Sequence, residues 1–597
     1  MAMTARPLMA ARALCILGVA AALQAPRHHQ RLTALRTATI SAPDTGIYSV
    51  GCEDTSASLT RLAARSDSWA ATTMAERVTV AEAILDALRE EDWGGAWLEA
   101  QVDLEGIVGD DARRTSASQT RFVFGSTVKD MVASFVEAHG GDGQSERRTA
   151  LLKGEAVAVG AAVPGATMEV RRGEKPAQTG AAPGTVTLVL GAGNQSFLTL
   201  LDALQRALVD GETVLVKHHP LRPWLADPFA KILGPLVELD VVAQTLDAGV
   251  VEASALVADP RVGHVHITGS EATRDAVRAT LDAAGKSAVA ISAELGCATP
   301  WLVPPGEWTA KELANAASAL VAGKKANGGS NCLSPQVVLL ADGWPQKDAF
   351  LDEVAAQIAA QPTWKAYYPG AAGRRDDVLQ AYGRARLGDG NDDVALLDVG
   401  VAGAPGFDGS ALSKEVFGPL LAVCALPGGA AAGPWLRDEA VPFANSDAVL
   451  GSLSCTLLAP ASLEPAFVDA AVDGLNYGAV AVNCWSVFCY TAMCNGGTWG
   501  AHATDVDERS GAGAIGNVFG VPDAAKTVVR AGTLEKPGVD LAKPPPALVF
   551  DALHAALLKH EGSSALKAAL NLLLRRGLGK ANVIPGLKGP KFGAALP

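Results

Sequence analysis

The sequence predicts an α/β fold with a doubly wound parallel sheet. From residue 184 onward, short apolar strands alternate with helical segments: a strand at 185–190, a helix at 197–208 and a strand at 213–217. Parallel strands need crossover helices, and such strands are apolar throughout because helices cover both faces of the sheet. The alternation continues with a helix at 228–239, which Pro235 bends, and with strands at 241–246, 262–268 and 287–292.

The composition is that of a globular protein with more than one domain. The chain has 597 residues, of which 49% are hydrophobic and 19% are charged. Its formal net charge of −13 argues against a nucleic-acid partner, because phosphate binding needs a basic surface. The nine cysteines are irregularly spaced, which favours a reducing compartment over a disulfide framework.

The N-terminal segment, residues 1–43, is predicted to be a targeting presequence. It contains arginines but no Asp or Glu, and an apolar run at 14–23 is too short to span a bilayer, which takes about 20 residues. A signal-like core followed by a basic tail resembles the two-part presequences of plastid proteins. We therefore expect a plastid protein, with the mitochondrion as the alternative, and no membrane span in the mature chain.

The rest of the chain falls into distinct regions. Residues 56–140 have the apolar spacing of amphipathic helices, and residues 156–171 suggest a β-hairpin. A second α/β unit is expected at 309–490. A linker ending in Pro544-Pro545-Pro546 precedes a Leu- and Ala-rich helical segment at 548–578.

Polar and flexible residues stand at the ends of the predicted strands. Asn194, Lys217, Thr268-Gly269-Ser270 and Glu294 all occupy such positions. In open α/β sheets, ligands bind at the carboxyl ends of the strands, so these residues are predicted to share one site.

A single cysteine follows a glycine turn in the segment Asn327-Gly328-Gly329-Ser330-Asn331-Cys332. A thiol in this position can face a cleft together with its own backbone N–H, as a covalent nucleophile requires. The alternative is a buried, unreactive thiol, which is common for free cysteine.

Taken in order, these motifs resemble the aldehyde dehydrogenase superfamily over roughly residues 55–530. The segments that carry the resemblance are Asn194, Lys217, Thr268-Gly269-Ser270, Glu294-Leu295-Gly296, Asn327-x-Gly329-x-x-Cys332 and Glu415-Val416-Phe417-Gly418-Pro419. The resemblance implies a Rossmann-type cofactor domain, an α/β catalytic domain and a β-hairpin oligomerisation element.

The resemblance also implies domain boundaries. They are a presequence at 1–43, a cofactor-binding domain at 44–293 with its hairpin near 155–171, a catalytic domain at 294–475, a return to the cofactor domain with an oligomerisation strand at 476–535, and a helical extension at 536–597. A homodimer or homotetramer is implied, assembled through the strands near 155–171 or around 531–550.

Three residues are implied to be catalytic. Cys332 would attack an aldehyde carbon, and the Asn194 side chain and the Cys332 N–H would hold the developing oxyanion. Glu294 would activate the water that hydrolyses the resulting thioester.

Five residues are implied to bind NAD or NADP. Lys217 resembles the lysine at the adenosine ribose, and Gly269 and Ser270 would approach the pyrophosphate at a helix N-terminus. Glu415, with Phe417 beside it, resembles the carboxylate at the nicotinamide ribose. Each of these residues could instead serve structure alone, as a cap, a turn or a solvated charge.

The chain departs from the family pattern at five positions, one of which is Ala298 in place of a lysine. Gly193 replaces an aromatic residue before Asn194, which suggests a more flexible oxyanion segment, and Arg274 replaces a glycine. Cys297 replaces a glycine near the presumed base; simple packing is the first explanation, and a regulatory disulfide with Cys332 is the alternative. Pro220 stands where an acidic residue often selects NAD.

This last departure favours NADP over NAD. Without a carboxylate at residue 220, a 2′-phosphate would not be repelled there, and three nearby residues could attract it: His218, His219 and Arg222.

The segment 484–500 is predicted to be a cavity-lining loop with no metal site. Its spacing, Cys484-x4-Cys489-x4-Cys494, lacks the close Cys pairs that zinc prefers. Its aromatic residues suit either an apolar substrate tunnel or ordinary core packing.

The sequence therefore favours an NAD(P)-dependent aldehyde dehydrogenase whose substrate is a small-molecule aldehyde. One alternative is a relative that releases the acyl group to coenzyme A, although the presence of Glu294 speaks against it. A second is a catalytically silent protein kept for binding or assembly.

Overall fold

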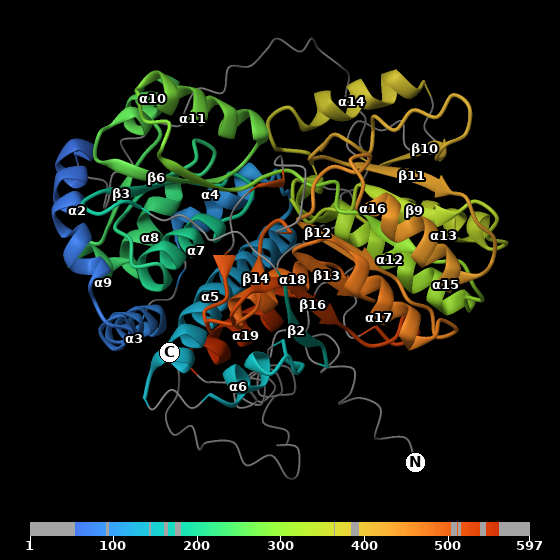
Figure 1. Ribbon diagram of the computed structural model, residues 1–597, viewed down its shortest axis with the longest axis horizontal. Coiled ribbons are helices and arrows are strands. Elements are labelled where there is room, and N and C mark those ends of the chain that lie inside the picture. The colour runs from blue at the N-terminus through green and yellow to red at the C-terminus, as the bar shows by residue number, and fades with distance from the viewer. Residues whose placement is uncertain are drawn as a thin grey trace.

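The structure, a computed structural model, describes residues 54–559 with short gaps. The gaps are 91–92, 94, 142–144, 160–164, 174–180, 363–364, 384–392, 503–509, 512–514, 538–541 and 543–544. The expected presequence at 1–43 lies outside the described residues, as does the chain beyond residue 559. Figure 1 shows two α/β units side by side, with a long helix running between and beneath them.

The first unit contains a five-stranded parallel sheet in the order β5-β4-β3-β6-β7. Its strands are β3 (Val186–Leu190), β4 (Val214–Lys217), β5 (Val242–Thr245), β6 (Val262–Thr268) and β7 (Ala290–Glu294). The strands are buried because helices cover both faces. A cluster that includes Leu59, Val277 and Leu281 packs on one face, and the cluster of Leu200, Leu204 and Phe229 packs on the other. The predicted parallel α/β fold is confirmed.

The helices of this unit follow the predicted order with one break. They are α7 (Leu198–Leu204), a π-helical turn (Gln205–Val209), a 3-10 turn (Pro223–Leu225), α8 (Ala226–Ile232), α9 (Gly234–Val237), α10 (Val250–Ala258) and α11 (Glu271–Ala283). The helix predicted at 228–239 is two helices. Pro235 lacks an N–H and its ring clashes with the preceding turn, so the chain restarts at Gly234.

The N-terminal region is helical, as predicted. Its helices are α2 (Thr55–Ala70), α3 (Met74–Glu90), α4 (Ala96–Leu104), α5 (Asp110–His139) and α6 (Glu146–Leu152). Helix α5 is buried along much of its length. The C-terminal helix α19 (Ala547–Lys559) packs on α5, where the Phe122 and Phe550 rings lie 5.9 Å apart and Arg121 pairs with Asp551 at 2.8 Å.

The second unit is built on a nine-stranded sheet in the order β1-β2-β16-β13-β12-β8-β9-β11-β10. Its strands are β1 (Val157–Ala158), β2 (Thr167–Arg172), β8 (Trp301–Val303), β9 (Val337–Ala341), β10 (Ala395–Val401), β11 (Leu420–Leu426), β12 (Ser454–Leu457), β13 (Ala479–Val482) and β16 (Ala524–Arg530). Strands β1 and β2 form the predicted antiparallel hairpin and add it to the edge of an otherwise parallel sheet.

The helices of the second unit include one that the sequence missed. They are α12 (Ala310–Lys325), a 3-10 turn (Ala326–Gly329), α13 (Lys347–Ala360), α14 (Ala371–Tyr382), α15 (Ala432–Trp435), a π-helical turn (Leu436–Ala440), α16 (Val441–Ala444), α17 (Pro465–Gly474) and α18 (Val487–Cys494). The loop prediction for 484–500 was wrong, because α18 forms there and a short sheet pairs β14 (Thr498–Trp499) with β15 (Ile515–Gly516). The Cys and Gly residues suggested a loop, but α18 is buried and its side chains join the core.

The second candidate oligomerisation strand, around 531–550, is not a strand in the part of that range which the structure describes. Strand β16 ends at Arg530, a turn links Thr533 to Lys536, and α19 begins at Ala547. Across the described residues, no helix is both long and apolar enough to cross a bilayer.

Candidate functional site

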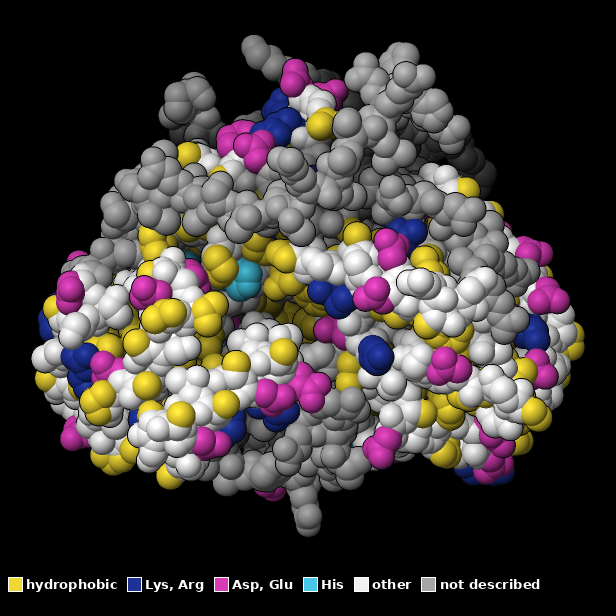
Figure 2. Space-filling model, turned by 90° about the horizontal axis from the view of Figure 1, so that it is seen from above, with side chains coloured by type: hydrophobic (Ala, Val, Ile, Leu, Met, Phe, Trp, Pro, Cys, Tyr) yellow, Lys and Arg dark blue, Asp and Glu magenta, His cyan; other side chains and the backbone are white. Residues whose placement is uncertain are grey.

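A cavity of about 610 Å³ brings the predicted site residues together. Its lining includes all eight of them: Asn194, Lys217, Gly269, Ser270, Glu294, Cys332, Glu415 and Phe417. The first five come from the first α/β unit and the last three from the second. Figure 2 shows a hollow in the middle of the upper face, where hydrophobic side chains and a histidine gather.

The parallel sheet explains why distant residues meet. Lys217 pairs with Leu190 in the register of β3 and β4, and Asn194 follows β3 by a few residues. Thr268 pairs with Glu294 at the end of β6 and β7, and the Gly269 N–H donates to the Glu294 carbonyl oxygen at 3.0 Å. All these residues therefore lie at the carboxyl edge of one sheet.

The turn before Cys332 requires its glycines. Asn327, Gly328 and Gly329 have φ values of 55°, 62° and 76°, a left-handed run in which glycine is favoured. A Cβ on Gly329 would lie 2.5 Å from the Gly418 carbonyl carbon. The turn therefore lets the Cys332 segment pack directly on the backbone of the Glu415–Pro419 motif.

We expect Gly329→Ala to lower the free energy of unfolding by about 1–3 kcal/mol, because it adds a Cβ to a left-handed residue in close contact. Chemical denaturation measures this change. Gly373→Ala, in helix α14 with open space around its Cβ, is the matched control and should be neutral or stabilising by up to about 1 kcal/mol. Equal effects of the two substitutions would contradict the packing described here.

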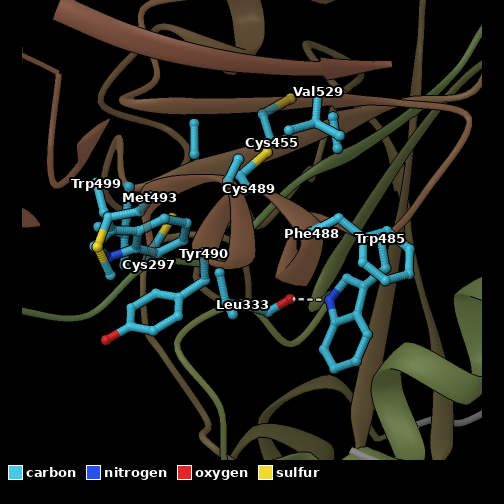
Figure 3. Packing of buried hydrophobic residues seen from close by; sticks show 14 of the residues in the cluster. Cys297, Leu333, Cys455, Trp485, Phe488, Cys489, Tyr490, Met493, Trp499 and Val529 are labelled. Atoms are coloured by element: carbon cyan, nitrogen blue, oxygen red, sulfur yellow. Dashed lines mark hydrogen bonds between the residues drawn. The ribbon is translucent and has the colours of Figure 1, made fainter. Parts of the chain in front are cut away.

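Hydrogen bonds from separate parts of the chain hold the segment that carries Cys332. The carbonyl oxygen of Ser330 accepts from Asn194 Nδ2 at 3.2 Å, and that of Cys332 accepts from Thr299 Oγ1 at 2.8 Å. The Leu333 carbonyl accepts from Trp485 Nε1 at 2.6 Å, the bond drawn in Figure 3. Three carbonyls between residues 330 and 333 are thus bonded, which fixes the main chain that carries the Cys332 side chain.

The Cys332 thiol is protonated at neutral pH in the protein alone. Burial raises its pKa, and the Glu415 and Glu294 carboxylates raise that pKa further. The thiolate is the reactive form, so a base must take the proton before attack. Glu294 lines the same cavity and is the base that the sequence predicted.

Alkylation of Cys332 by iodoacetamide should therefore accelerate about tenfold per pH unit between pH 7 and 9, without reaching a plateau. At pH values below the pKa of the thiol, the fraction present as thiolate rises about tenfold for each pH unit. Mass spectrometry of the Cys332 peptide measures the rate, and Cys332→Ala shows the background from other cysteines. A plateau below pH 8 would indicate a thiol with a lowered pKa and would contradict this description.

The segment before Asn194 is more rigid than its glycine suggested. A Cβ on Gly193 would lie 2.5–2.7 Å from three atoms of the His219 ring, so His219 fills the space that a side chain at 193 would need. Arg222 donates to the carbonyl oxygens of Gly193 and Asn194, both at 2.9 Å, and Asn327 Nδ2 donates to the latter at 2.9 Å. The expected flexibility is corrected accordingly.

Glu294 is held by its backbone from two sides. It is 5% exposed at the end of β7, and it forms an isolated bridge with Gly511. A Cβ on Gly511 would lie 2.1 Å from the Ala293 carbonyl oxygen, which explains a glycine there. The main chain at Glu294 is therefore held in place, and its side chain lines the cavity.

Sequence reasoning missed a buried lysine beside Glu415. Burial lowers the pKa of Lys324 to about 7, and Glu415 opposes this shift. Burial also raises the pKa of Glu415 to about 7, although the Cys297 N–H, Arg374 and Lys324 favour its charged form. Lys324 donates to the Gly418 carbonyl at 3.0 Å. Lys324 lies in the last turn of α12, directly before the glycine turn that leads to Cys332. This position in the sequence could have marked it as a residue near the site.

Cys297 behaves as a core residue. Its side chain is 2% exposed, its sulfur lies 3.7 Å from the Ser454 carbonyl oxygen, and its backbone N–H donates to Glu415 Oε1 at 3.4 Å. Burial raises the pKa of its thiol. These contacts favour the packing explanation, because a buried neutral thiol is poorly suited to disulfide chemistry.

Helix α11 begins at the cavity. Ser270 is its N-cap and accepts from the Thr273 N–H at 3.2 Å. Arg274, which replaces a glycine of the family pattern, pairs with Asp275 at 2.7 Å and with Glu271 at 3.9 Å and does not line the cavity. The substitution therefore leaves this end of the cavity open.

The three cysteines of the 484–500 segment are buried, and Figure 3 shows Cys489 of α18 among core side chains. Burial raises the thiol pKa of Cys484 to about 12 and raises those of Cys489 and Cys494 as well. Among the described residues, no group of three or more His, Cys, Asp or Glu side chains could hold a metal ion.

Comparisons with known proteins agree with this arrangement. A family model described as "Aldehyde dehydrogenase family" matches residues 148–366. An aldehyde dehydrogenase of Craterostigma plantagineum is 27% identical over 257 residues, which cover 40% of this chain and 50% of that protein. The chain spans about half, or less, of the length of the curated relatives that we compared.

Solved structures share the fold. A lactaldehyde dehydrogenase structure superposes with a TM-score of 0.54 at 20% identity, covering 79% of this chain and 89% of that chain. An NADP complex of NADP-dependent glyceraldehyde-3-phosphate dehydrogenase from Bacillus halodurans C-125 gives a TM-score of 0.53 at 16% identity, with the same coverage.

The fold and the site thus define an α/β protein in which the carboxyl edge of a five-stranded parallel sheet shares a cavity with a cysteine from a second α/β unit. The family model and the curated relatives thus make the chain similar to aldehyde dehydrogenases over part of its length, and the solved structures share its fold.

Proposed function

We propose that this protein oxidises an aldehyde to a carboxylate with NAD or NADP, through a thioester on Cys332. The observation that carries the proposal is the common cavity, where Cys332 meets Asn194 and Glu294 from strand ends of the other unit. A thiol, an amide donor and a carboxylate are the nucleophile, oxyanion donor and base that acyl chemistry needs.

The three residues would act in sequence. Glu294 takes the thiol proton, the Cys332 sulfur attacks the carbonyl carbon, and the developing oxyanion accepts a hydrogen bond from Asn194. The Asn194 amide carries two hydrogens, so it can hold the Ser330 carbonyl and still donate to the substrate. Loss of hydride to the bound cofactor would leave the acyl group on sulfur as a thioester. Once Glu294 has released the thiol proton to solvent, it can take a proton from the attacking water and return it to the leaving Cys332 sulfur.

The residues along the cavity fit a dinucleotide. They offer an ammonium at Lys217, a helix N-terminus at Ser270 and a carboxylate at Glu415, which suit a ribose, a pyrophosphate and a second ribose. When bound, NAD(P) supplies the hydride acceptor. The NADP preference expected from the sequence rests on the absence of a carboxylate at Pro220 and on three basic residues near it, His218, His219 and Arg222.

One experiment distinguishes the proposed function from two alternatives. A relative that releases its acyl group to coenzyme A would not need Glu294, and a silent binding protein would not need an activated thiol. An aldehyde panel with NAD and NADP, with and without coenzyme A, distinguishes them. The proposal expects cofactor reduction without coenzyme A; cofactor binding with no turnover of any aldehyde would favour the silent protein.

We also propose assembly into a homodimer or homotetramer, supported by the β1–β2 hairpin at the edge of the larger sheet. Import into a plastid, or alternatively a mitochondrion, remains our proposal for residues 1–43, based on their composition.

A further inference from the structure

An acidic residue that the sequence did not single out lies at one end of the cavity. Asp247 follows β5, lines the cavity and forms an ion pair with Lys217 at the end of β4. Its other carboxylate oxygen, Oδ1, accepts the Gly249 N–H at 2.8 Å. Gly249 has a φ of 115°, a left-handed value that places this N–H at little steric cost. The carboxylate is therefore fixed in orientation.

We infer that Asp247 is the residue that selects the cofactor: its carboxylate would accept hydrogen bonds from the adenosine ribose hydroxyls and favour NAD over NADP. This inference rests on the proposed NAD(P)-dependent function. A carboxylate near a strand end that accepts from the ribose 2′-hydroxyl is a general device of dinucleotide-binding sheets. Here it would come from β5, in place of the acidic residue absent at Pro220.

The surrounding surface supports an adenosine at this end. Between α10 and α11 the lining is formed by apolar side chains and a few hydroxyls: Val250, Ala253, Ser254, Val257, Thr273, Ala276, Val277 and Thr280. Such a slot suits the flat face of a base. A base held there would place its ribose toward the strand ends that carry Lys217 and Asp247.

The basic residues named as candidates for a 2′-phosphate offer it little charge. His218 is 2% exposed and bonds Gln244 at 2.8 Å, and burial lowers its pKa to about 4. His219 packs against Gly193, and burial first, then Arg222 and Lys217, lower its pKa to about 4 as well.

Arg222 is also directed elsewhere. It is 1% exposed, does not line the cavity, and donates to the carbonyls of Gly193 and Asn194. Lys217 is already paired with Asp247. Arg374, which also lines the cavity, donates to the Val416 carbonyl oxygen next to Glu415 at 2.8 Å. A 2′-phosphate at this end of the cavity would therefore meet the Asp247 carboxylate, which favours NAD in place of the NADP preference expected from the sequence.

The test measures binding rather than turnover. The dissociation constants of NAD and NADP are determined by calorimetric titration of the full chain and of Asp247→Asn. For the wild type we expect NAD to bind at least about tenfold more tightly than NADP. In Asp247→Asn, the ratio of the two constants should shift toward NADP by about 10–100-fold, because a charge-assisted hydrogen bond to NAD and a repulsion of NADP are both lost.

Two further variants keep the result interpretable. Asp240→Asn removes a carboxylate that pairs with Arg61 on the exposed surface, outside the cavity lining, and should leave the ratio unchanged. Adding Pro220→Glu to Asp247→Asn should restore the NAD preference, because residue 220 also lines the cavity. This rescue separates a recognition role from simple misfolding.

The outcomes distinguish the inference from the proposed function. Binding of both cofactors with a ratio that Asp247→Asn does not change, or a wild type that prefers NADP, overturns the role of Asp247 and leaves the function standing. If the folded wild type binds neither cofactor, the proposed function fails and the inference fails with it.

Discussion

Replacing Cys332 by alanine should lower the rate of aldehyde oxidation by about 10⁴-fold or more. The covalent route disappears when the sulfur is removed, and the remaining donors can bind substrate but cannot form the thioester. Reduction of the cofactor, followed by absorbance with the aldehyde that the wild type uses best, measures the loss. Cofactor binding should be retained, because Cys332 contributes neither ribose nor pyrophosphate contacts in the proposed site.

Cys424→Ala is the matched control for this variant. Cys424 is a free, fully buried thiol in β11, and it does not line the cavity. Its replacement should leave the rate close to that of the wild type. Equal activity of Cys332→Ala and the wild type would remove the nucleophile from the mechanism.

Glu294→Gln should separate the two halves of the reaction. The amide cannot take a proton from water, so hydrolysis of the thioester should slow by about 10²–10⁴-fold. Because Glu294 is also the proposed base for the thiol, the variant should form the thioester more slowly than the wild type, and faster as the pH rises and more thiolate is present. We expect this slowed burst to stop at no more than one equivalent of reduced cofactor per site and to be followed by a still slower steady state. Rapid mixing with absorbance detection resolves the two phases.

The control for Glu294→Gln is the same substitution at a glutamate outside the site. Glu82 is exposed on α3, far in sequence from the site, and Glu82→Gln should turn over like the wild type. A steady-state rate for Glu294→Gln equal to that of Glu82→Gln would show that another group activates the water. Restoration of its turnover by coenzyme A would favour the acylating alternative.

The strand-end residues were predictable because the signal is local. An apolar strand followed by Asn194, Lys217, Gly269 or Glu294 is visible in a few residues of sequence, and the geometry of a parallel sheet brings those ends together. The same rule could have found Asp247, which comes directly after the strand predicted at 241–246. It was missed because its importance depends on Lys217, thirty residues earlier.

Other features depended on contacts between distant segments. His219 fills the space beside Gly193, and Lys324 donates a hydrogen bond to the Gly418 carbonyl. Neither contact can be predicted from the spacing of the residues or from the composition. The sequence predicts a loop where helix α18 forms, because the cysteines of this segment and the glycines after it obscure an apolar helix that tertiary packing stabilises. That the pKa of Cys332 is raised also could not be predicted, because the shift comes mainly from burial of the thiol, which the sequence alone does not give.

The most direct test of the central claim is the mass of the Cys332 peptide during turnover. Glu294→Gln is mixed with an aldehyde and a cofactor, quenched in acid and digested. The account predicts that this peptide gains the mass of the aldehyde less two hydrogens, as a thioester requires, in proportion to the reduced cofactor formed. Formation of reduced cofactor by this variant while the Cys332 peptide stays unmodified would contradict it.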